Sequence, residues 1–329
     1  MNRILDLEAG QVMVVTDLHG DYAAYSRYRD RFMALRAAGQ AEVFLLAGDY
    51  LHSATPQETD RSLEIVLDLL RLRETLGPGL VVLLGNHELP HLYGITISKG
   101  SLVYGPRFEK AMGSHRASIL EFFDDLPFYL RTRAGVAIAH AGACEPATMG
   151  SGLQRLRAYS HRAELDKVDA FLADQDRASL RAGLGKLSDQ VYANLAAENL
   201  GVTDPADPRY DDVLRGVLVT SLSSPFQMVW EALFNKNEDE YGELKYAWIL
   251  KAFLNSLSEG YGNQRALVSG HISVVGGHQI VAHRQLRLAS WAHANPVQAG
   301  EYLLFDAGKP IQGVEDLLAG VHSLWDKTN

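Results

Sequence analysis

Three short apolar runs in the first ninety residues each end in a polar cluster that contains glycine. The runs and their clusters are residues 12–15 with 16–21, residues 43–47 with 48–50, and residues 80–84 with 85–88. Helix-forming sequence separates consecutive runs, and this alternation predicts parallel strands covered by helices. Ligands of such sheets bind beyond the carboxyl ends of the strands. We therefore expect the fold to bring the three clusters together.

Two later apolar runs end in histidine. Residues 136–139 lead into His140, and residues 266–269 lead into Gly270 and His271. With the first three clusters they give six candidate metal ligands: Asp17, His19, Asp49, Asn86, His140 and His271. Carboxylate, imidazole and amide groups together suit Mn, Fe or Zn. Two such ions, bridged by Asp49 on the middle strand, would form a clamp for displacement at a phosphate ester. A water held between them would lose a proton near neutral pH and become the nucleophile.

The order of these motifs resembles the calcineurin-like metallophosphoesterases, and most closely their phosphoprotein phosphatase branch, which includes Ser/Thr phosphatases. The motifs are Asp-x-His-Gly at 17–20, Gly-Asp at 48–49, Gly-Asn-His-Glu at 85–88, Ala-His-Ala-Gly at 139–142 and Gly-His at 270–271. Many metallophosphoesterases end in Gly-His-x-His, and Ser273 in place of the second histidine favours this branch. The resemblance assigns Asp17, His19 and Asp49 to the first metal. It assigns Asp49, Asn86, His140 and His271 to the second.

The resemblance also implies the fold. We expect an α/β protein of four layers, in which a mixed β-sandwich is flanked by helices and carries a helical insert. A single metallophosphoesterase domain should cover residues 1–329, with the helical cap at about 150–215 and a C-terminal helix at about 314–326. The alternating pattern of residues 279–282, 286–290 and 302–305 predicts a meander of antiparallel strands.

Several positions depart from the family's pattern. His87 matches the family histidine that protonates the leaving oxygen. His52 stands where an Asp would orient that histidine, and we expect His52 to take over this role. Ser53 and Leu84 stand where the family often has arginines that bind the phosphate.

Another cation must therefore bind the phosphate. The apolar segment 226–230 resembles the segment that precedes a further family arginine, and the next cation along the chain is Lys236. We expect Lys236 to bind the phosphate, with Arg162 of the cap as the alternative. A third interpretation is that Lys236 is an ordinary solvated lysine beside the acidic residues 238–240 and does not bind the phosphate.

Composition restricts the partners and the compartment. The net charge of −9 and the lack of a long basic run argue against general binding to nucleic acids. The single cysteine, Cys144, excludes an internal disulfide, fits a reducing compartment and is expected to be buried and inert. No apolar run approaches the ~18 residues of a membrane span, and residues 1–10 do not resemble a signal peptide. We expect a cytoplasmic protein.

The function expected from these features is hydrolysis of phosphomonoesters, with phosphorylated proteins or small phosphoesters as substrates. The missing arginines and the cap favour an alternative, the hydrolysis of a dinucleoside polyphosphate, a cyclic nucleotide or another diester. The altered residues 49–54 favour a third hypothesis, a metal-binding module without turnover. His278 and His293 are expected near the site, where they either support the ligands or only pack.

Overall fold

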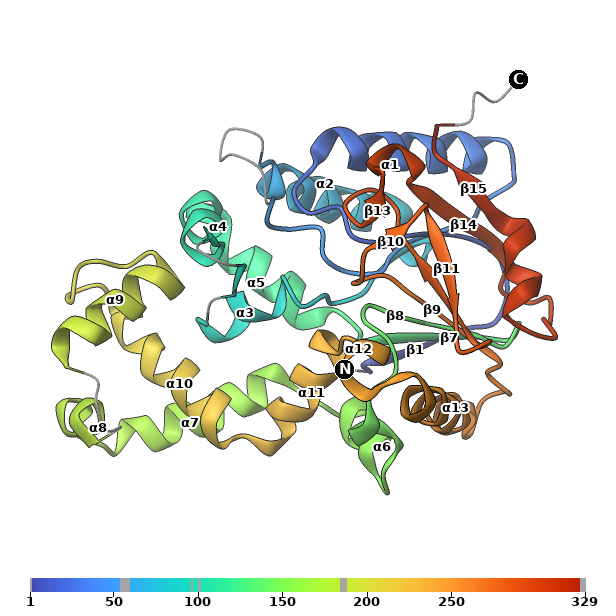
Figure 1. Ribbon diagram of the computed structural model, residues 1–329. Helices are drawn as coiled ribbons and strands as arrows, with labels where there is room; N and C mark the ends of the chain where they lie inside the picture. Colours follow the sequence, from blue (N-terminus) through green and yellow to red (C-terminus); the bar gives the residue numbers. More distant parts are fainter. Residues whose placement is uncertain (1, 54–59, 96, 100–101, 184–187, 326–329) are drawn as a thin grey trace. The chain divides into compact units, whose positions relative to one another are not determined.

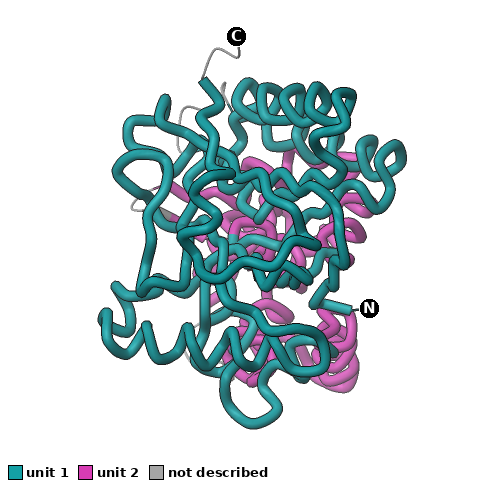
Figure 2. Tube along the Cα trace, turned by 90° about the vertical axis from the view of Figure 1, so that its right-hand side faces the viewer, with its two compact units in different colours: residues 1–86, 126–158, 228–329 teal, residues 87–125, 159–227 magenta. Residues whose placement is uncertain are grey.

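The computed structural model describes residues 2–53, 60–95, 97–99, 102–183 and 188–325. The chain divides into two compact units, drawn in different colours in Figure 2. The first unit comprises residues 1–86, 126–158 and 228–329, and the second comprises residues 87–125 and 159–227. The predicted single domain and the limits of its cap stay predictions. Ala54 of the altered motif and Asp326 of the expected C-terminal helix lie outside the described residues.

One sheet of the first unit holds the strands that precede the first three clusters. Its five strands, in spatial order, are β15 (Val321–Ser323), β14 (Glu301–Asp306), β2 (Gln11–Val15), β3 (Val43–Leu46) and β4 (Leu80–Val82). Strands β2, β3 and β4 are parallel, with Val14 opposite Leu45 and Leu45 opposite Val81. The parallel arrangement predicted from the apolar runs is therefore confirmed, and the carboxyl ends of these strands lie at one edge.

The second sheet of this unit holds the strands that precede His140 and His271. Its order is β1 (Ile4–Leu7), β7 (Tyr129–Thr132), β8 (Val136–Ala139), β9 (Ala266–Ser269), β12 (Gln285–Leu288) and β11 (His278–Val281). Strands β8 and β9 are parallel neighbours, with Ile138 opposite Val268. His140 and His271 thus follow adjacent strand ends.

The two sheets pack against each other through one apolar core. The residues that alternate along the strands to fill it include Val12, Val14, Leu45, Val81, Val136, Ile138, Val268, Leu286, Leu288 and Leu303. All ten are less than 9% exposed. Removing this much apolar surface from water is the main stabilising contribution to the sandwich. The expected mixed β-sandwich is confirmed.

Helices cover the outer faces of the sandwich and complete four layers (Figure 1). Helix α1 (Tyr22–Ala37) lies on the five-stranded sheet, where Phe32 stacks on Phe44 of β3 with ring centroids 4.9 Å apart, and α2 (Ser62–Leu76) packs beside it. Helix α13 (Glu243–Ser258) covers the six-stranded sheet, with Phe253 edge-on to Tyr129 of β7 at 5.2 Å. The side chain of Asp21 caps α1 by accepting the N–H of Ala24 at 2.9 Å.

The first unit also contains short elements. They are α6 (Gly152–Arg157), α12 (Glu238–Tyr241), the paired strands β10 (Val274–Val275) and β13 (Ala294–Asn295), and the 3-10 helices η2 (Gly77–Gly79), η4 (Glu145–Thr148), η6 (Val297–Ala299) and η7 (Val314–Gly320). Helix α11 (Ser224–Phe234) begins among residues of the second unit and ends among those of the first.

The second unit is mainly helical. Its elements are α3 (Leu89–Tyr93), β5 (Ser98–Lys99), β6 (Leu102–Val103), α4 (Gly105–Met112), η3 (Gly113–His115), α5 (Arg116–Asp125), α7 (His161–Ala173), α8 (Arg177–Gly183), α9 (Asp189–Leu200), η5 (Pro208–Asp211) and α10 (Asp212–Leu222). Tyr192 of α9 anchors a small apolar core and donates its hydroxyl to the carbonyl of Tyr210 at 2.9 Å. A buried Glu109 joins α4 to two neighbouring elements through His91 and Arg116, each 2.8 Å away.

Two predictions about the last part of the chain are wrong. Strands β11 and β12 are antiparallel as expected, but β14 leaves the predicted meander and pairs with β2 of the other sheet, because Leu303 and Phe305 belong to the shared core. The expected C-terminal helix is the short 3-10 helix η7 followed by strand β15, which pairs with β14. A Cβ at Gly320 would lie 2.0 Å from the carbonyl oxygen of Leu304, so a side chain would not fit where η7 ends beside β14.

Candidate metal centre

All six predicted ligands lie in the first unit, in the segments that follow β2, β3, β4, β8 and β9. Asp17, Asp49, Asn86 and His140 are buried, whereas His19 and His271 are partly exposed. Their potential ligand atoms converge: one group joins Asp49, His140 and His271, with every pair of atoms within 4.8 Å. The fold therefore gathers the clusters that the strand ends predicted.

Two of the histidines present the same ring nitrogen, Nε2, to other residues of the site: His19 to His293 and His140 to Asn86. Nδ1 of His19 lies 3.1 Å from the carbonyl oxygen of Leu51, and Nδ1 of His140 lies 2.9 Å from that of Ala47. Because a carbonyl can only accept, Nδ1 carries the proton in both rings and Nε2 is unprotonated in the neutral form. A backbone carbonyl on the far nitrogen is the usual support of a metal-binding histidine.

Asp49 lies between the Nε2 atoms of these two histidines. Its Oδ2 is 3.9 Å from Nε2 of His19, and its Oδ1 is 3.4 Å from Nε2 of His140. The same nitrogen of His140 is 2.7 Å from Oδ1 of Asn86. With Nδ1 of His140 protonated, its Nε2 and the Oδ1 of Asn86 are two acceptors that face each other. A cation bound by both atoms would stabilise this arrangement. The donor set therefore fits divalent ions.

His271 presents a further unused nitrogen. Its Nδ1 is buried and has no hydrogen-bond partner among the residues that the structure describes. Its ring lies edge-on to that of His140 with centroids 5.0 Å apart. A buried ring nitrogen without a partner costs free energy, and metal coordination is one way to recover it.

Backbone strain is concentrated at this site. His19, Asp49 and His271 have positive φ angles of 42°, 56° and 69°, and His52 has 68°. Residues other than glycine rarely adopt this conformation, which costs of the order of 1–3 kcal/mol at each position. Strain of this kind is typical of functional sites, because the surrounding structure must hold the side chains in one orientation.

Burial and charge set the protonation states of the ligands. Burial favours the neutral carboxyl of Asp17, but attraction to the His293 and His140 imidazoles outweighs it and holds the pKa of Asp17 well below its usual range. Burial, with repulsion from His293, lowers the pKa of His19 to about 4. Burial likewise lowers the pKa of His140 and of His271. At neutral pH the Asp17 carboxylate is charged and the imidazoles of His19, His140 and His271 are neutral, which is the form that binds metal ions.

The two residues expected to act as the acid and its support lie in different units. His87 directly follows Asn86 and belongs to the second unit, where its ring lies 5.3 Å from that of Tyr104. His52 belongs to the first unit, is 2% exposed, and donates its backbone N–H to Oγ of Ser62 at 2.9 Å. Their catalytic roles stay predictions.

The two candidates for binding the phosphate are both exposed. Lys236 lies in the first unit between two buried asparagines: Nδ2 of Asn235 donates to the carbonyl of Ala143 at 2.6 Å, and Nδ2 of Asn237 donates to that of Ala141 at 3.1 Å. The backbone of Lys236 is thus attached to the loop that follows His140. Arg162 lies in the second unit, is 77% exposed, and pairs with Asp166 at 2.8 Å. Neither assignment is tested by these contacts.

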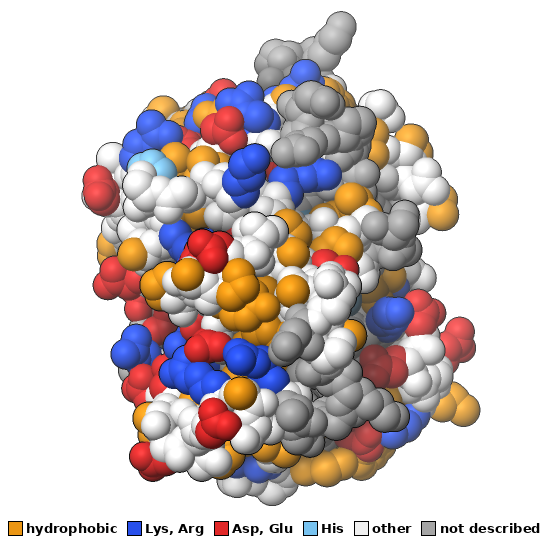
Figure 3. Space-filling model, turned by 90° about the vertical axis from the view of Figure 1, so that its left-hand side faces the viewer, with side chains coloured by type: hydrophobic (Ala, Val, Ile, Leu, Met, Phe, Trp, Pro, Cys, Tyr) orange, Lys and Arg blue, Asp and Glu red, His pale blue; other side chains and the backbone are white. Residues whose placement is uncertain are grey.

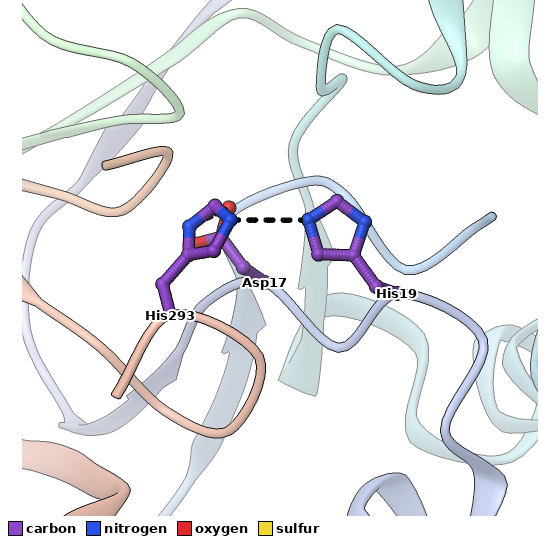
Figure 4. A group of neighbouring side chains, drawn as sticks. All are labelled: Asp17, His19 and His293. Carbon is purple, nitrogen blue, oxygen red and sulfur yellow. Dashed lines mark hydrogen bonds and ion pairs between the residues drawn. The ribbon is translucent and has the colours of Figure 1, made fainter. Parts of the chain in front are cut away.

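His293 is the residue whose importance the sequence underestimated. It lies beside Asp17 and faces His19 (Figure 4). These three side chains form a second group whose potential ligand atoms are all within 4.8 Å of one another. His278, the other histidine expected near the site, is instead exposed and bonded to Glu301 at 2.7 Å. No motif around residue 293 distinguishes the two.

A fold of this kind with carboxylate, amide and imidazole groups at its strand ends defines a metal-dependent phosphoester hydrolase. Residues 10–202 match the family model described as calcineurin-like phosphoesterase, and the chain belongs to this family. It is a metallophosphoesterase, as the motifs indicated. No curated protein sequence matches the chain.

Solved structures with a similar fold include two phosphatases. One is a protein serine/threonine phosphatase from Saccharomyces cerevisiae with similarity to human phosphatase PP5, at 14% identity and a TM-score of 0.48, covering 92% of this chain and 76% of that one. The other is a cold-active protein-tyrosine phosphatase of a psychrophilic Shewanella species, at 14% identity and a TM-score of 0.46, covering 94% and 78%.

Two observations concern membrane spans and the charge of the surface. No helix among the described residues combines the length and the apolar character needed to cross a bilayer. On the face drawn in Figure 3, Lys and Arg side chains lie among Asp and Glu side chains. The expected cytoplasmic location stays a prediction.

Proposed function

We propose that this metallophosphoesterase is a dinuclear phosphatase that hydrolyses phosphomonoesters, including phosphorylated side chains of proteins. The observation that carries the proposal is the position of Asp49, whose two carboxylate oxygens face Nε2 of two different histidines, His19 and His140. A carboxylate in this position would suit the ligand shared by two ions about 3.5–4 Å apart.

The ligands divide into two sets that share Asp49. Asp17 and His19 complete the first set, and Asn86, His140 and His271 complete the second. Mn, Fe or Zn ions bound there would act as Lewis acids on the phosphate oxygens and would lower the pKa of a bound water. Asp49 would hold the two sets together, because its one carboxylate group would supply a ligand atom to each.

The remaining roles fall to residues around the ligands. His87 would give a proton to the leaving oxygen, and His52 would orient it. Lys236 or Arg162 would bind the phosphate in place of the missing arginines; lysine acts as a point charge without the two-pronged geometry of arginine. The substrate should therefore be held less firmly by this residue than by an arginine.

An alternative function is favoured by the same departures. His52 and Ser53 are both buried at positions where the family usually has Asp and Arg, so the phosphate-binding surface differs from that of the phosphoprotein phosphatases. Hydrolysis of a nucleotide or a diester, such as a dinucleoside polyphosphate or a cyclic nucleotide, is the corresponding hypothesis.

A substrate panel tests the proposal. Chelator-treated protein is reconstituted separately with Mn²⁺, Fe²⁺ and Zn²⁺ and assayed with p-nitrophenyl phosphate, its bis ester, phosphopeptides and a dinucleoside polyphosphate. Asn86→Ala provides the inactive control, because it removes a ligand of one ion. The proposal predicts metal-dependent turnover that is highest on monoesters. Preference for the bis ester or the dinucleotide would establish the alternative, and metal-loaded protein inert on the whole panel would leave a binding module.

A further inference from the structure

We propose that His293 is a fourth protein ligand of the ion bound by Asp17, His19 and Asp49. This inference rests on the dinuclear centre proposed above and adds a residue that the family's motifs do not supply. It would give each ion four protein ligands, with Asp49 shared: Asp17, His19, Asp49 and His293 for the first, and Asp49, Asn86, His140 and His271 for the second.

The spacing of the two imidazoles is that of two ligands on one ion. Nε2 of His293 is hydrogen-bonded to Nε2 of His19 at 3.3 Å, whereas Nδ1 of His19 is bonded to the Leu51 carbonyl. Metal–nitrogen bonds of about 2.0–2.1 Å place two such ligands roughly 2.8–3.4 Å apart, for angles between octahedral and tetrahedral. The same ring lies close to Asp17, with Nδ1 3.2 Å from Oδ1.

Both ring nitrogens of His293 face groups of the proposed first ligand set. Nε2 is bonded to Nε2 of His19, and Nδ1 lies 3.2 Å from Oδ1 of Asp17 without a hydrogen bond of acceptable geometry. The side chain is only 16% exposed. A cation bound by Asp17 and by Nε2 of both rings would replace the contact between the rings, and Nδ1 of His293 would carry its proton towards Asp17.

The loop that carries His293 is fastened to the segment that carries Asp17. Thr16 donates its N–H to Oγ of Ser290 at 2.9 Å, and Ser290 donates its N–H to Oγ1 of Thr16 at 3.2 Å. Ala292 donates its N–H to the carbonyl of Asp17 itself at 3.2 Å. These contacts join residues more than 270 positions apart, so the approach of His293 to Asp17 is fixed by the backbone and does not depend on a mobile side chain.

His278 shows how a nearby histidine without this role is placed. Its ring is 37% exposed and its Nδ1 is already bonded to Oε2 of Glu301 at 2.7 Å. It is absent from the described groups of potential ligands. His278→Ala is therefore the matched control for substitution of His293.

The experiment uses the full chain, stripped with a chelator and titrated with Co²⁺ alone. Calorimetry gives the number of ions and the affinity of each step, and proton NMR of the Co²⁺ protein detects the shifted exchangeable N–H of each coordinated imidazole. The wild type should bind two ions and show such a signal from each of His19, His140, His271 and His293. His293→Ala should lose one signal and weaken one binding step by more than the ~10–100-fold that loss of a supporting hydrogen bond costs. His278→Ala should match the wild type.

Chemical rescue separates loss of a ligand from general damage. His293→Gly leaves room for free imidazole, which should restore the weakened step and return a shifted N–H signal. If the wild type binds two ions while His293→Ala keeps both affinities and all signals, the assignment of His293 is overturned and the dinuclear centre stands. If His293→Gly weakens binding without rescue by imidazole, His293 only positions the ligands. A wild type that does not bind two ions would refute the proposed function, and this inference with it.

Discussion

The backbone N–H of His271 donates hydrogen bonds to both carboxylate oxygens of Asp17, at 3.0 Å each. These residues are 254 positions apart, and each follows a strand of a different sheet. The contact fixes the carboxylate of one predicted ligand to the backbone of another. It requires Gly270, because a Cβ atom there would come within 2.0 Å of Oδ2 of Asp17.

Substitution of Gly270 should therefore damage the first metal site. Gly270→Ala forces the Asp17 carboxylate away from its place, and we expect roughly a 10–100-fold loss in affinity for one of the two ions, comparable to loss of a supporting contact. Calorimetric titration of the metal-free protein measures this directly. Gly262→Ala is the control, because its Cβ would meet only Nη1 of Arg133 at 3.6 Å. Unchanged affinities in Gly270→Ala would show that Asp17 is not held in this way.

His87→Asn tests the proposed acid. The variant should keep both ions but lose roughly 10²–10⁴-fold in kcat, the usual contribution of general acid catalysis. The loss should be smaller for aryl phosphates, whose leaving groups need less protonation, than for alkyl phosphates. Steady-state assays on both substrate types provide the comparison, with the exposed His115→Asn as the control. An equal loss on both types would mean that His87 has a structural role.

Lys236 and Arg162 are the rival phosphate-binding residues. Lys236→Ala should lower turnover by roughly 10–10³-fold at unchanged metal content, since a cation that stabilises developing charge contributes this much. Lys236→Arg should retain activity, and Lys251→Ala, another exposed lysine, should have no effect. Normal turnover in Lys236→Ala together with loss in Arg162→Ala would assign the role to the cap.

Glu109 gives a pH dependence of stability that is independent of the metal centre. Burial favours the neutral carboxyl, but hydrogen bonds and attraction from His91 and Arg116 outweigh it and lower its pKa. Because the pKa of Glu109 is lower in the folded than in the unfolded chain, its carboxylate stabilises the fold at pH values above the unfolded-state pKa of about 4.5. This stabilisation is lost as the pH falls towards the folded-state pKa. Glu109→Gln should cost roughly 1–3 kcal/mol of unfolding free energy at pH 7.

Urea unfolding at several pH values checks this prediction. The difference between wild type and Glu109→Gln should shrink steadily once the pH drops below about 4.5, because the wild-type carboxyl then becomes neutral as well. Glu121→Gln, on an exposed face of α5, is the control at each pH. A difference that stays constant through this range would mean that the charge of Glu109 does not contribute.

The convergence of the candidate metal ligands was predictable from the sequence because each follows an apolar run. Asp17, Asp49 and Asn86 stand just after β2, β3 and β4, and parallel strands bring such positions together without further information. These strands of three to five residues are short enough for an apolar run to define them. The local pattern and the sheet topology therefore both indicate a site at the carboxyl ends of β2, β3 and β4.

The sequence did not single out His293 as a neighbour of Asp17 and His19, because nothing local distinguishes it from His278. Its position depends on the bonds between Thr16 and Ser290, which join segments that are distant in sequence. The end of the chain was mispredicted for a similar reason. The spacing of Val314, Leu317 and Val321 fits a helix. In the structure, residues 321–323 instead form a strand that pairs with the edge of β14. Tertiary pairing determines the outcome in both cases.

The most direct test of the dinuclear centre is the metal content and activity of Asp49→Asn beside wild type and the exposed control Asp30→Asn. Each protein is reconstituted with Mn²⁺, freed of excess ions, and analysed for metal per chain and for turnover of p-nitrophenyl phosphate. Because the oxygens of Asp49 face both His19 and His140, we predict two ions in wild type and Asp30→Asn, and loss of binding at both sites with loss of activity in Asp49→Asn. Two ions per chain and full activity in Asp49→Asn would contradict the account.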